Sequence, residues 1–157
     1  MKLKTLFSAA ALALLAACSD DGPIGPEIPA LTPLPAGVTT VTTASGLQYA
    51  DITVGTGTAV AQTGNQVAVH YTGWLADGKG FDTSVGLPPF QLKLGEADVI
   101  PGFQEGILGM KLNGKRRLFI PAALAYGATA VYDQNGKLVI PANSNLIFDV
   151  ELVGLQQ

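Results

Sequence analysis

The feature that most constrains the fold of this chain is an alternation of apolar and polar residues near its C-terminus. In "NLIFDVELV", residues 145–153, large apolar side chains recur at every second position: Leu146, Phe148, Val150 and Leu152. Successive side chains of a strand point to opposite faces, so Asp149 and Glu151 point away from the apolar set. A helix has a period of 3.6 and would scatter these residues around its axis. The segment therefore predicts a strand with one buried face.

Four further runs have the composition or alternation of strands: "GLQYADITVGTG", "QVAVHYTGW", "FQLKL" and "KRRLFIP". The exception is "VIPGFQEGILGM", residues 99–110, where apolar residues lie three or four apart and Pro101 suits a first helical turn. Its glycines would keep this helix short and let it lie close to a sheet: Gly102, Gly106 and Gly109. Several strands and one short helix predict an α+β fold, a twisted antiparallel sheet over a short helix, in residues 46–157.

The N-terminus has the layout of a secretory signal. Lys2 and Lys4 form a positive region, and "LFSAAALALLAA" is an apolar run closed by small residues. This run is shorter than the roughly 20 residues that a membrane-spanning helix needs. Residues 1–17 are therefore predicted to be a signal peptide outside the folded domain.

Cys18 is the only cysteine, so an internal disulfide is excluded. The string "LAAC", residues 15–18, resembles a bacterial lipobox. That resemblance implies cleavage before Cys18, diacylglycerol on its sulfur and a fatty acid such as palmitate on the new N-terminus. More than one acyl chain gives stable anchoring, whereas a single chain holds marginally. An ordinary signal peptide with a nearby cysteine is the alternative. We expect a lipid-anchored protein of the bacterial cell envelope, at the outer membrane or periplasmic face.

Residues 18–45 differ in composition from the rest of the chain. Five of the ten prolines fall here, at positions 23, 26, 29, 33 and 35, and neither helical nor strand periodicity is evident. This composition predicts an extended, semi-rigid tether. A proline-rich docking motif is less favoured, because no basic residue flanks the prolines. The segment is too short and too broken by proline for a dimerisation helix, so we expect a monomer.

The usual catalytic constellations are missing from the sequence. His70 is the only histidine, and on the predicted strand it points to the opposite face from Tyr71, so we interpret it as structural. A serine or cysteine nucleophile then has no evident partner base. No clustered side chains have metal-ligand spacing, and "GTGTAVAQTG" lacks the lysine of a phosphate loop. The net charge of −3 and the absence of a basic patch argue against nucleic acid. We predict no metal, no cofactor and no nucleic-acid partner.

The stretch "VHYTGWLADGKGFDTS", residues 69–84, places polar groups beside aromatic rings. Tyr71 lies on a predicted strand, and Phe81 and Asp82 follow a turn at Asp77-Gly78. A carboxylate beside a ring is costly unless a donor satisfies it, and a buried tyrosine hydroxyl needs a partner. We predict that Tyr71 donates a hydrogen bond to Asp82 at the edge of an apolar ligand pocket.

Five blocks, in order, resemble successive parts of an FKBP-type peptidyl-prolyl cis-trans isomerase domain: "VHYTGWLADGKGFDTS", "PFQLKLG", "VIPGFQEGILGMKLNGKRRLFIP", "AYGA" and "IPANSNLIFDVELVGL". The resemblance covers residues 46–155 almost entirely. It implies a curled antiparallel sheet wrapped over one short helix, and rotation of Xaa-Pro bonds in exported or envelope polypeptides without covalent chemistry. It also implies macrolide inhibitors as ligands. The pocket residues it implies are Tyr71, Phe81, Asp82, Phe90, Val99, Ile100, Phe103, Tyr126, Ile140 and Phe148.

Two departures from the family bear on ligand preference. Phe103 stands at the pocket floor where many relatives carry tryptophan, which implies a roomier floor. Residues 128–140 are longer than in the shortest relatives, and Asn135-Gly136 within "DQNGK" predicts a hairpin tip. The alternative function is a chaperone or surface module that binds proline-containing segments with little turnover. A purely structural lipoprotein would leave the tyrosines and Asp82 unexplained.

Overall fold

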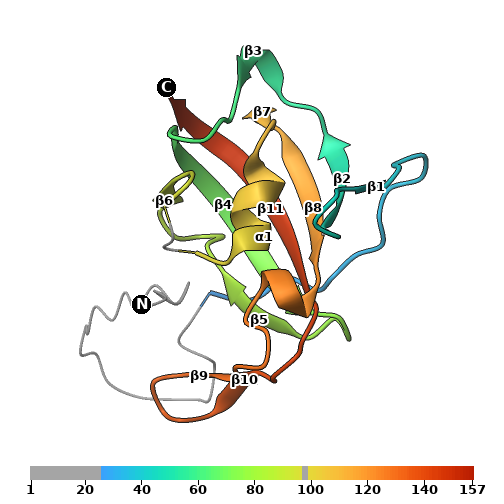
Figure 1. Ribbon diagram of the computed structural model, residues 1–157, viewed down its shortest axis with the longest axis vertical. Helices are drawn as coiled ribbons and strands as arrows, with labels where there is room; N and C mark the ends of the chain where they lie inside the picture. The colour runs from blue at the N-terminus through green and yellow to red at the C-terminus, as the bar shows by residue number, and fades with distance from the viewer. Residues whose placement is uncertain (1–25, 97–98) are drawn as a thin grey trace.

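The structure is a computed structural model that describes residues 26–96 and 99–157 (Figure 1). The expected signal peptide, residues 1–17, and the lipidation site Cys18 lie outside the described residues. Within the described part of the chain, no helix is long and apolar enough to cross a membrane.

Seven strands form one antiparallel sheet in the order β1-β2-β8-β11-β4-β5, and β6 also pairs with β4. Each of the five runs predicted as strands overlaps one of them. The strands are β1 (Val41–Thr42), β2 (Gln48–Thr53), β4 (Gln66–Leu75), β5 (Gly80–Thr83), β6 (Phe90–Lys93), β8 (Lys115–Ile120) and β11 (Leu146–Gln156). The long strands β4 and β11 run side by side in the middle of the sheet.

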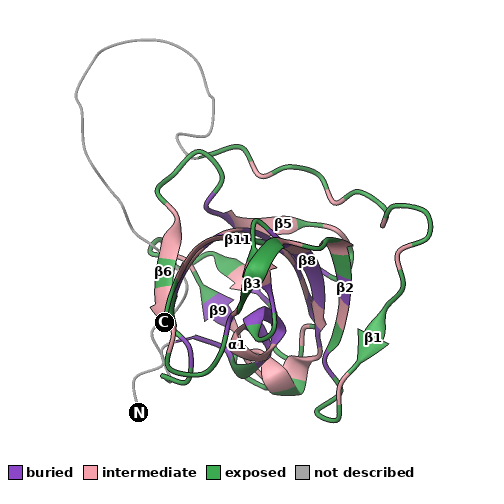
Figure 2. Ribbon diagram, turned by 90° about the horizontal axis from the view of Figure 1, so that it is seen from above, coloured by how far each residue is buried: buried purple, intermediate pink, exposed green. Residues whose placement is uncertain are grey.

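The sheet curls around helix α1 (Pro101–Ile107), as Figure 2 shows from above. Proline occupies the first turn of α1, as predicted. The helix lies close to β8 because Gly106 has no side chain: a Cβ there would stand 2.4 Å from the Leu118 side chain. The predicted α+β fold, a curled antiparallel sheet over one short helix, is confirmed.

The inner face of the sheet forms the core together with α1. On β11, the four apolar residues of the alternating run are at most 1% exposed, whereas Asp149 between them is only partly covered. The alternation near the C-terminus therefore assigned the buried face of this strand correctly.

On β4, Val69, Tyr71 and Gly73 alternate with His70, Thr72 and Trp74, which predicts a half-buried strand, and this prediction is wrong near residue 74. Thr72 and Trp74 lie on the outer face, yet they are 5% and 3% exposed. The indole Nε1 of Trp74 donates to the carbonyl oxygen of Pro29 at 2.8 Å, so the N-terminal segment covers this part of the sheet. The described part of the expected tether contains a turn at residues 36–37, and it packs against the domain. Strand β1 also pairs with β2 ahead of the expected domain start at residue 46.

Arg116, the second residue of β8, connects α1 to the sheet. Its Nη1 donates to the carbonyl oxygens of Gly106 and Leu108, both at 3.0 Å, at the end of the helix. Its Nε and Nη2 donate to the Asp51 carboxylate at 2.6 and 3.2 Å. The guanidinium also lies 4.1 Å from the centre of the Tyr49 ring. Arg116 thus joins the helix end to β2 and is only 6% exposed.

Smaller elements complete the fold: β3 (Thr56–Val60), β7 (Lys111–Leu112), η1 (Ala122–Leu124), β9 (Val131–Tyr132) and β10 (Leu138–Ile140). Strands β9 and β10 pair antiparallel, so the hairpin predicted around "DQNGK" is confirmed. Asp133 organises its tip, because its Oδ1 accepts hydrogen bonds from the backbone amides of Asn135 and Lys137, both at 2.9 Å. Gly136 supplies the positive φ of 77° that the turn needs.

Candidate active site

Aromatic rings from five elements meet on the inner side of the sheet. The centre of the Tyr71 ring lies 5.9 Å from that of Phe90, 5.8 Å from Phe103 and 6.1 Å from Phe148. The Phe148 ring also lies 5.2 Å from Phe103 and 5.5 Å from Phe81. All these contacts are edge-to-face, the arrangement that ring quadrupoles favour. The cluster brings together residues from β4, β5, β6, α1 and β11.

Gly73 allows the Phe81 and Phe148 rings of this cluster to meet. It lies on the inner face of β4, two residues after Tyr71. A Cβ at this position would stand 2.7 Å from both the Phe81 and the Phe148 ring. Since real Cβ atoms do not approach so closely, a larger residue would push these rings apart.

The predicted hydrogen bond between Tyr71 and Asp82 is confirmed: the Tyr71 hydroxyl donates to Asp82 Oδ2 at 2.7 Å. Burial raises the pKa of Asp82, while the hydrogen bonds from Tyr71 and from the Thr83 backbone partly offset this by favouring the carboxylate. Burial also raises the pKa of Tyr71, and the neighbouring charge of Asp82, their hydrogen bond and Tyr126 raise it further. The Tyr71 hydroxyl is therefore held protonated, as a donor.

A cavity of about 310 Å³ opens beside this pair. That volume lies within the usual range for small-ligand sites, about 300–1,000 Å³. Three of the predicted site residues line it together with the loop that connects β5 and β6. The lining residues are Tyr71, Asp82, Thr83, Ser84, Leu87, Pro88, Pro89, Phe90 and Gln91.

The other predicted residues are not among those that line this cavity. Phe103 and Phe148 are 0% exposed and support the Tyr71 ring from the core side. Phe81 and Tyr126 are half-buried and pack against the same core. Val99, Ile100 and Ile140 belong to that core and are at most 4% exposed. The structure therefore gathers Tyr71, Asp82 and Phe90 at an opening and places most of the remaining set behind them.

Sequence reasoning missed the rim formed by Leu87, Pro88 and Pro89. The signal for it was the proline pair directly before β6, because consecutive prolines fix φ and give a stiff loop. Leu87 is 37% exposed and presents an apolar side chain at the mouth of the cavity.

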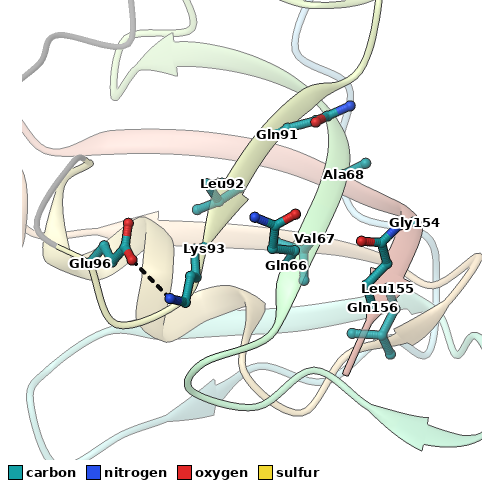
Figure 3. A pocket seen from close by; sticks show the side chains of 10 residues that line it. All are labelled: Gln66, Val67, Ala68, Gln91, Leu92, Lys93, Glu96, Gly154, Leu155 and Gln156. Atoms are coloured by element: carbon teal, nitrogen blue, oxygen red, sulfur yellow. Dashed lines mark ion pairs between the residues drawn. The ribbon is translucent and has the colours of Figure 1, made fainter.

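A larger hollow of about 730 Å³ lies elsewhere, near the ends of β4, β6 and β11 (Figure 3). Glutamine amides line it, and Lys93 pairs with Glu96 at 3.1 Å on one side. The residues that line it include no aromatic side chain. Despite its size, it lacks the ring cluster and the half-buried carboxylate of Asp82, so the smaller cavity at Tyr71 is the candidate active site. Among the described residues, no group of three His, Cys, Asp or Glu side chains could hold a metal ion.

Comparison with known proteins agrees with this fold. Residues 57–153 match the family described as FKBP-type peptidyl-prolyl cis-trans isomerase. The chain belongs to this family.

Individual relatives show how far the similarity extends. The chain is 47% identical over 117 residues to FK506-binding protein 4 of Dictyostelium discoideum, which covers 74% of the chain but only 30% of that relative. It is 44% identical over 118 residues to FK506-binding protein 1A of Neurospora crassa, covering 74% of the chain and 94% of that relative. The crystal structure of AtFKBP13 superposes with a TM-score of 0.67 at 36% identity, over 75% of this chain and 99% of that one. The shared part is the folded domain.

Proposed function

We propose that this protein is a peptidyl-prolyl cis-trans isomerase that accelerates rotation about Xaa-Pro bonds in exported or envelope polypeptides. The observation that carries the proposal is the cavity at Tyr71, Asp82 and Phe90, backed by an edge-to-face ring cluster in a domain of the isomerase family. No nucleophile or metal is needed, because the reaction neither breaks nor forms a covalent bond.

The apolar walls suit this reaction for a physical reason. The barrier to rotation is about 18–20 kcal/mol and arises from amide resonance. A flat amide is polar, whereas a twisted amide has lost resonance and carries less charge. Water therefore stabilises the flat form more than the twisted form. A ring-lined cavity reduces this difference in stabilisation and so lowers the free-energy barrier to rotation. Each tenfold acceleration corresponds to about 1.4 kcal/mol, so a few such contacts suffice.

We assign roles to the lining residues on the same basis. The proline ring of the substrate rests against the Tyr71 and Phe90 rings, and its amide carbonyl faces Asp82 and the positive ring edges. Outside this lining, the resemblance to the family assigns Tyr126 and the backbone amide of Ile100 to the neighbouring carbonyl. Because the Tyr71 hydroxyl is already committed to Asp82, the pair orders this edge of the cavity before substrate arrives.

Replacing Asp82, or the neighbouring Phe81 that packs on Phe148 behind the cavity, is expected to slow the enzyme. For Asp82→Ala and for Phe81→Ala we expect kcat/KM on a short Xaa-Pro peptide to fall about 10- to 100-fold, equivalent to the loss of about 1.4–2.7 kcal/mol of transition-state stabilisation. Glu151→Ala, on the exposed face of β11, is the matched control and should leave the rate unchanged. Unchanged rates in both site variants would reject the assignment. Peptide binding without acceleration by the wild type would favour the binding-module alternative.

We also propose that the cavity binds macrolides, since both relatives described above are named FK506-binding proteins. Rapamycin should then compete with the peptide substrate. The β9–β10 hairpin, with Tyr132 57% exposed, offers apolar surface that would alter this affinity relative to members with shorter loops.

The proposal includes a lipid anchor at Cys18 and a location in the bacterial envelope, supported by the lipobox-like string of residues 15–18. We expect Cys18→Ser to move the protein from the membrane fraction to the soluble fraction, since the thiol is the attachment point. Mass spectrometry of the N-terminal peptide should find the acyl chains in the wild type alone. A wild-type protein that is soluble without detergent would contradict the anchor.

A further inference from the structure

The N-terminal segment that covers the outer face of the sheet has a three-residue period. Ile28, Leu31 and Leu34 are half-buried, whereas the residues between them are exposed. A polyproline II helix has three residues per turn, so these apolar side chains share one face. Prolines at 29, 33 and 35 favour this conformation because they fix φ near −65°. We refer to residues 28–34 as the strap.

Three contacts fix the strap on the sheet. Ile28 packs on the bare backbone of Gly80 in β5, where a Cβ would stand 2.3 Å from the isoleucine Cγ2. Trp74 Nε1 donates to the carbonyl oxygen of Pro29 at 2.8 Å. Arg117 Nη1 donates to the carbonyl oxygen of Thr32 at 2.5 Å. The strap therefore crosses the sheet from β5 over β4 towards β8, on the side opposite α1 (Figure 2).

The two donors lie close together on the outer face. Trp74 on β4 and Arg117 on β8 flank β11, and the Arg117 guanidinium carbon lies 6.0 Å from the centre of the Trp74 ring. Their acceptors, Pro29 and Thr32, are three residues apart, which is one polyproline II turn. Carbonyls one turn apart therefore lie on the same side of such a segment, and both can face this pair of donors.

The fold holds both donors, Trp74 and Arg117, in fixed positions. Trp74 and Arg117 are 3% and 4% exposed. Asp149 accepts from Arg117 Nε and Nη2 at 2.6 and 2.8 Å, which leaves Nη1 directed at the strap. The strand register places Phe119, Ile147 and Trp74 in one row across the outer face. An apolar row with two fixed donors is the combination that grips proline-rich segments in aromatic-lined grooves.

We propose that this outer face is a second peptide-binding site, separate from the cavity at Tyr71. It recognises polyproline II segments that carry an apolar residue at every third position, and its resident ligand is the strap of the same chain. This proposal does not depend on isomerase activity.

The occupancy of this site can be followed directly, because Trp74 is the only tryptophan in the chain. In the full chain, Ile28→Ser/Leu31→Ser removes two apolar contacts and should release the strap. We expect the emission of Trp74 to shift to longer wavelength and its quenching by acrylamide to rise several-fold. Ala30→Ser/Ala36→Ser changes exposed positions of the same segment and should have no effect. Emission unchanged by the first double substitution would overturn the proposal.

Recognition in trans provides the second test. A synthetic peptide of residues 26–38 added to the released variant should restore the emission of Trp74. The same peptide with Leu31 and Thr32 exchanged, which breaks the three-residue spacing, should bind at least tenfold more weakly. If the native peptide at millimolar concentration does not restore the emission of Trp74, or if both peptides bind equally, the proposed site is overturned. Wild-type emission that depends on protein concentration would assign the site to the strap of a second copy and overturn the intramolecular assignment. The rate on an Xaa-Pro peptide should stay within twofold in the strap variants, which keeps this test independent of the cavity.

Discussion

Phe148→Ala is expected to lower the free energy of unfolding by about 3–5 kcal/mol, the usual cost of truncating a buried phenylalanine. The Phe148 ring is 0% exposed and meets the rings of Tyr71, Phe81 and Phe103. Its removal deletes these edge contacts and leaves a void that the curled sheet cannot close. Because the same rings support the cavity, kcat/KM should fall with stability. Urea unfolding followed by far-UV circular dichroism measures the first effect.

Tyr132→Ala is the matched control, since this ring is 57% exposed on the β9–β10 hairpin. Surface changes of this kind usually stay within about 0.5 kcal/mol. Phe148→Leu retains most of the volume and should lose less than the alanine variant. A loss below about 1 kcal/mol for Phe148→Ala would mean that the ring cluster is not a packed unit, and the site model would fail with it.

Arg116→Met should be the second large effect, with a loss of about 3 kcal/mol. Breaking one side of a buried ion pair costs about 3–5 kcal/mol, and Asp51 is 39% exposed, so part of the penalty is relieved by water. The substitution also removes the two hydrogen bonds from Nη1 to the carbonyl oxygens of Gly106 and Leu108 at the end of α1. Amide hydrogen exchange in the last turn of α1 should therefore accelerate more than the loss in global free energy of unfolding predicts.

Two further variants separate the contribution of the Arg116–Asp51 ion pair from that of the hydrogen bonds to the end of α1. Asp51→Asn removes only the exposed half of the pair and should cost less than Arg116→Met. Arg116→Lys keeps the charge but cannot form the forked hydrogen bonds, so it should fall between the two. Equal stability of Arg116→Met and wild type would show that α1 is held by packing alone.

The strands and the helix could be predicted because their patterns report burial directly. Alternation in β11 identified its core face, and Pro101 with its neighbouring glycines identified a short helix close to the sheet. The pairing of Tyr71 with Asp82 followed from the cost of leaving either group unsatisfied beside rings. These are local arguments, and they remained valid in the folded chain.

Two features escaped prediction because they depend on contacts between distant segments. The burial of Trp74 requires a segment more than forty residues earlier in the chain, and β4 alone gives no sign of that cover. The apolar period of three between residues 28 and 34 matches neither a helix nor a strand, so it was not recognised in the sequence. The predicted pocket residues also divide into a lining group and a supporting group, which depends on how deeply the sheet curls around α1.

The docked strap changes how far the domain can travel from an attachment at Cys18, if the proposed anchor is present. From Cys18 to Val41, where β1 joins the sheet, the chain could span about 78 Å when fully extended, but from Cys18 to Ile28 it can span only about 34 Å. The volume within reach scales with the cube of that radius, so docking would concentrate the domain near its attachment point by about 12-fold. Held this way, the cavity would sample polypeptides that pass close to the bilayer surface, and release of residues 28–34 would extend its working radius without altering its chemistry.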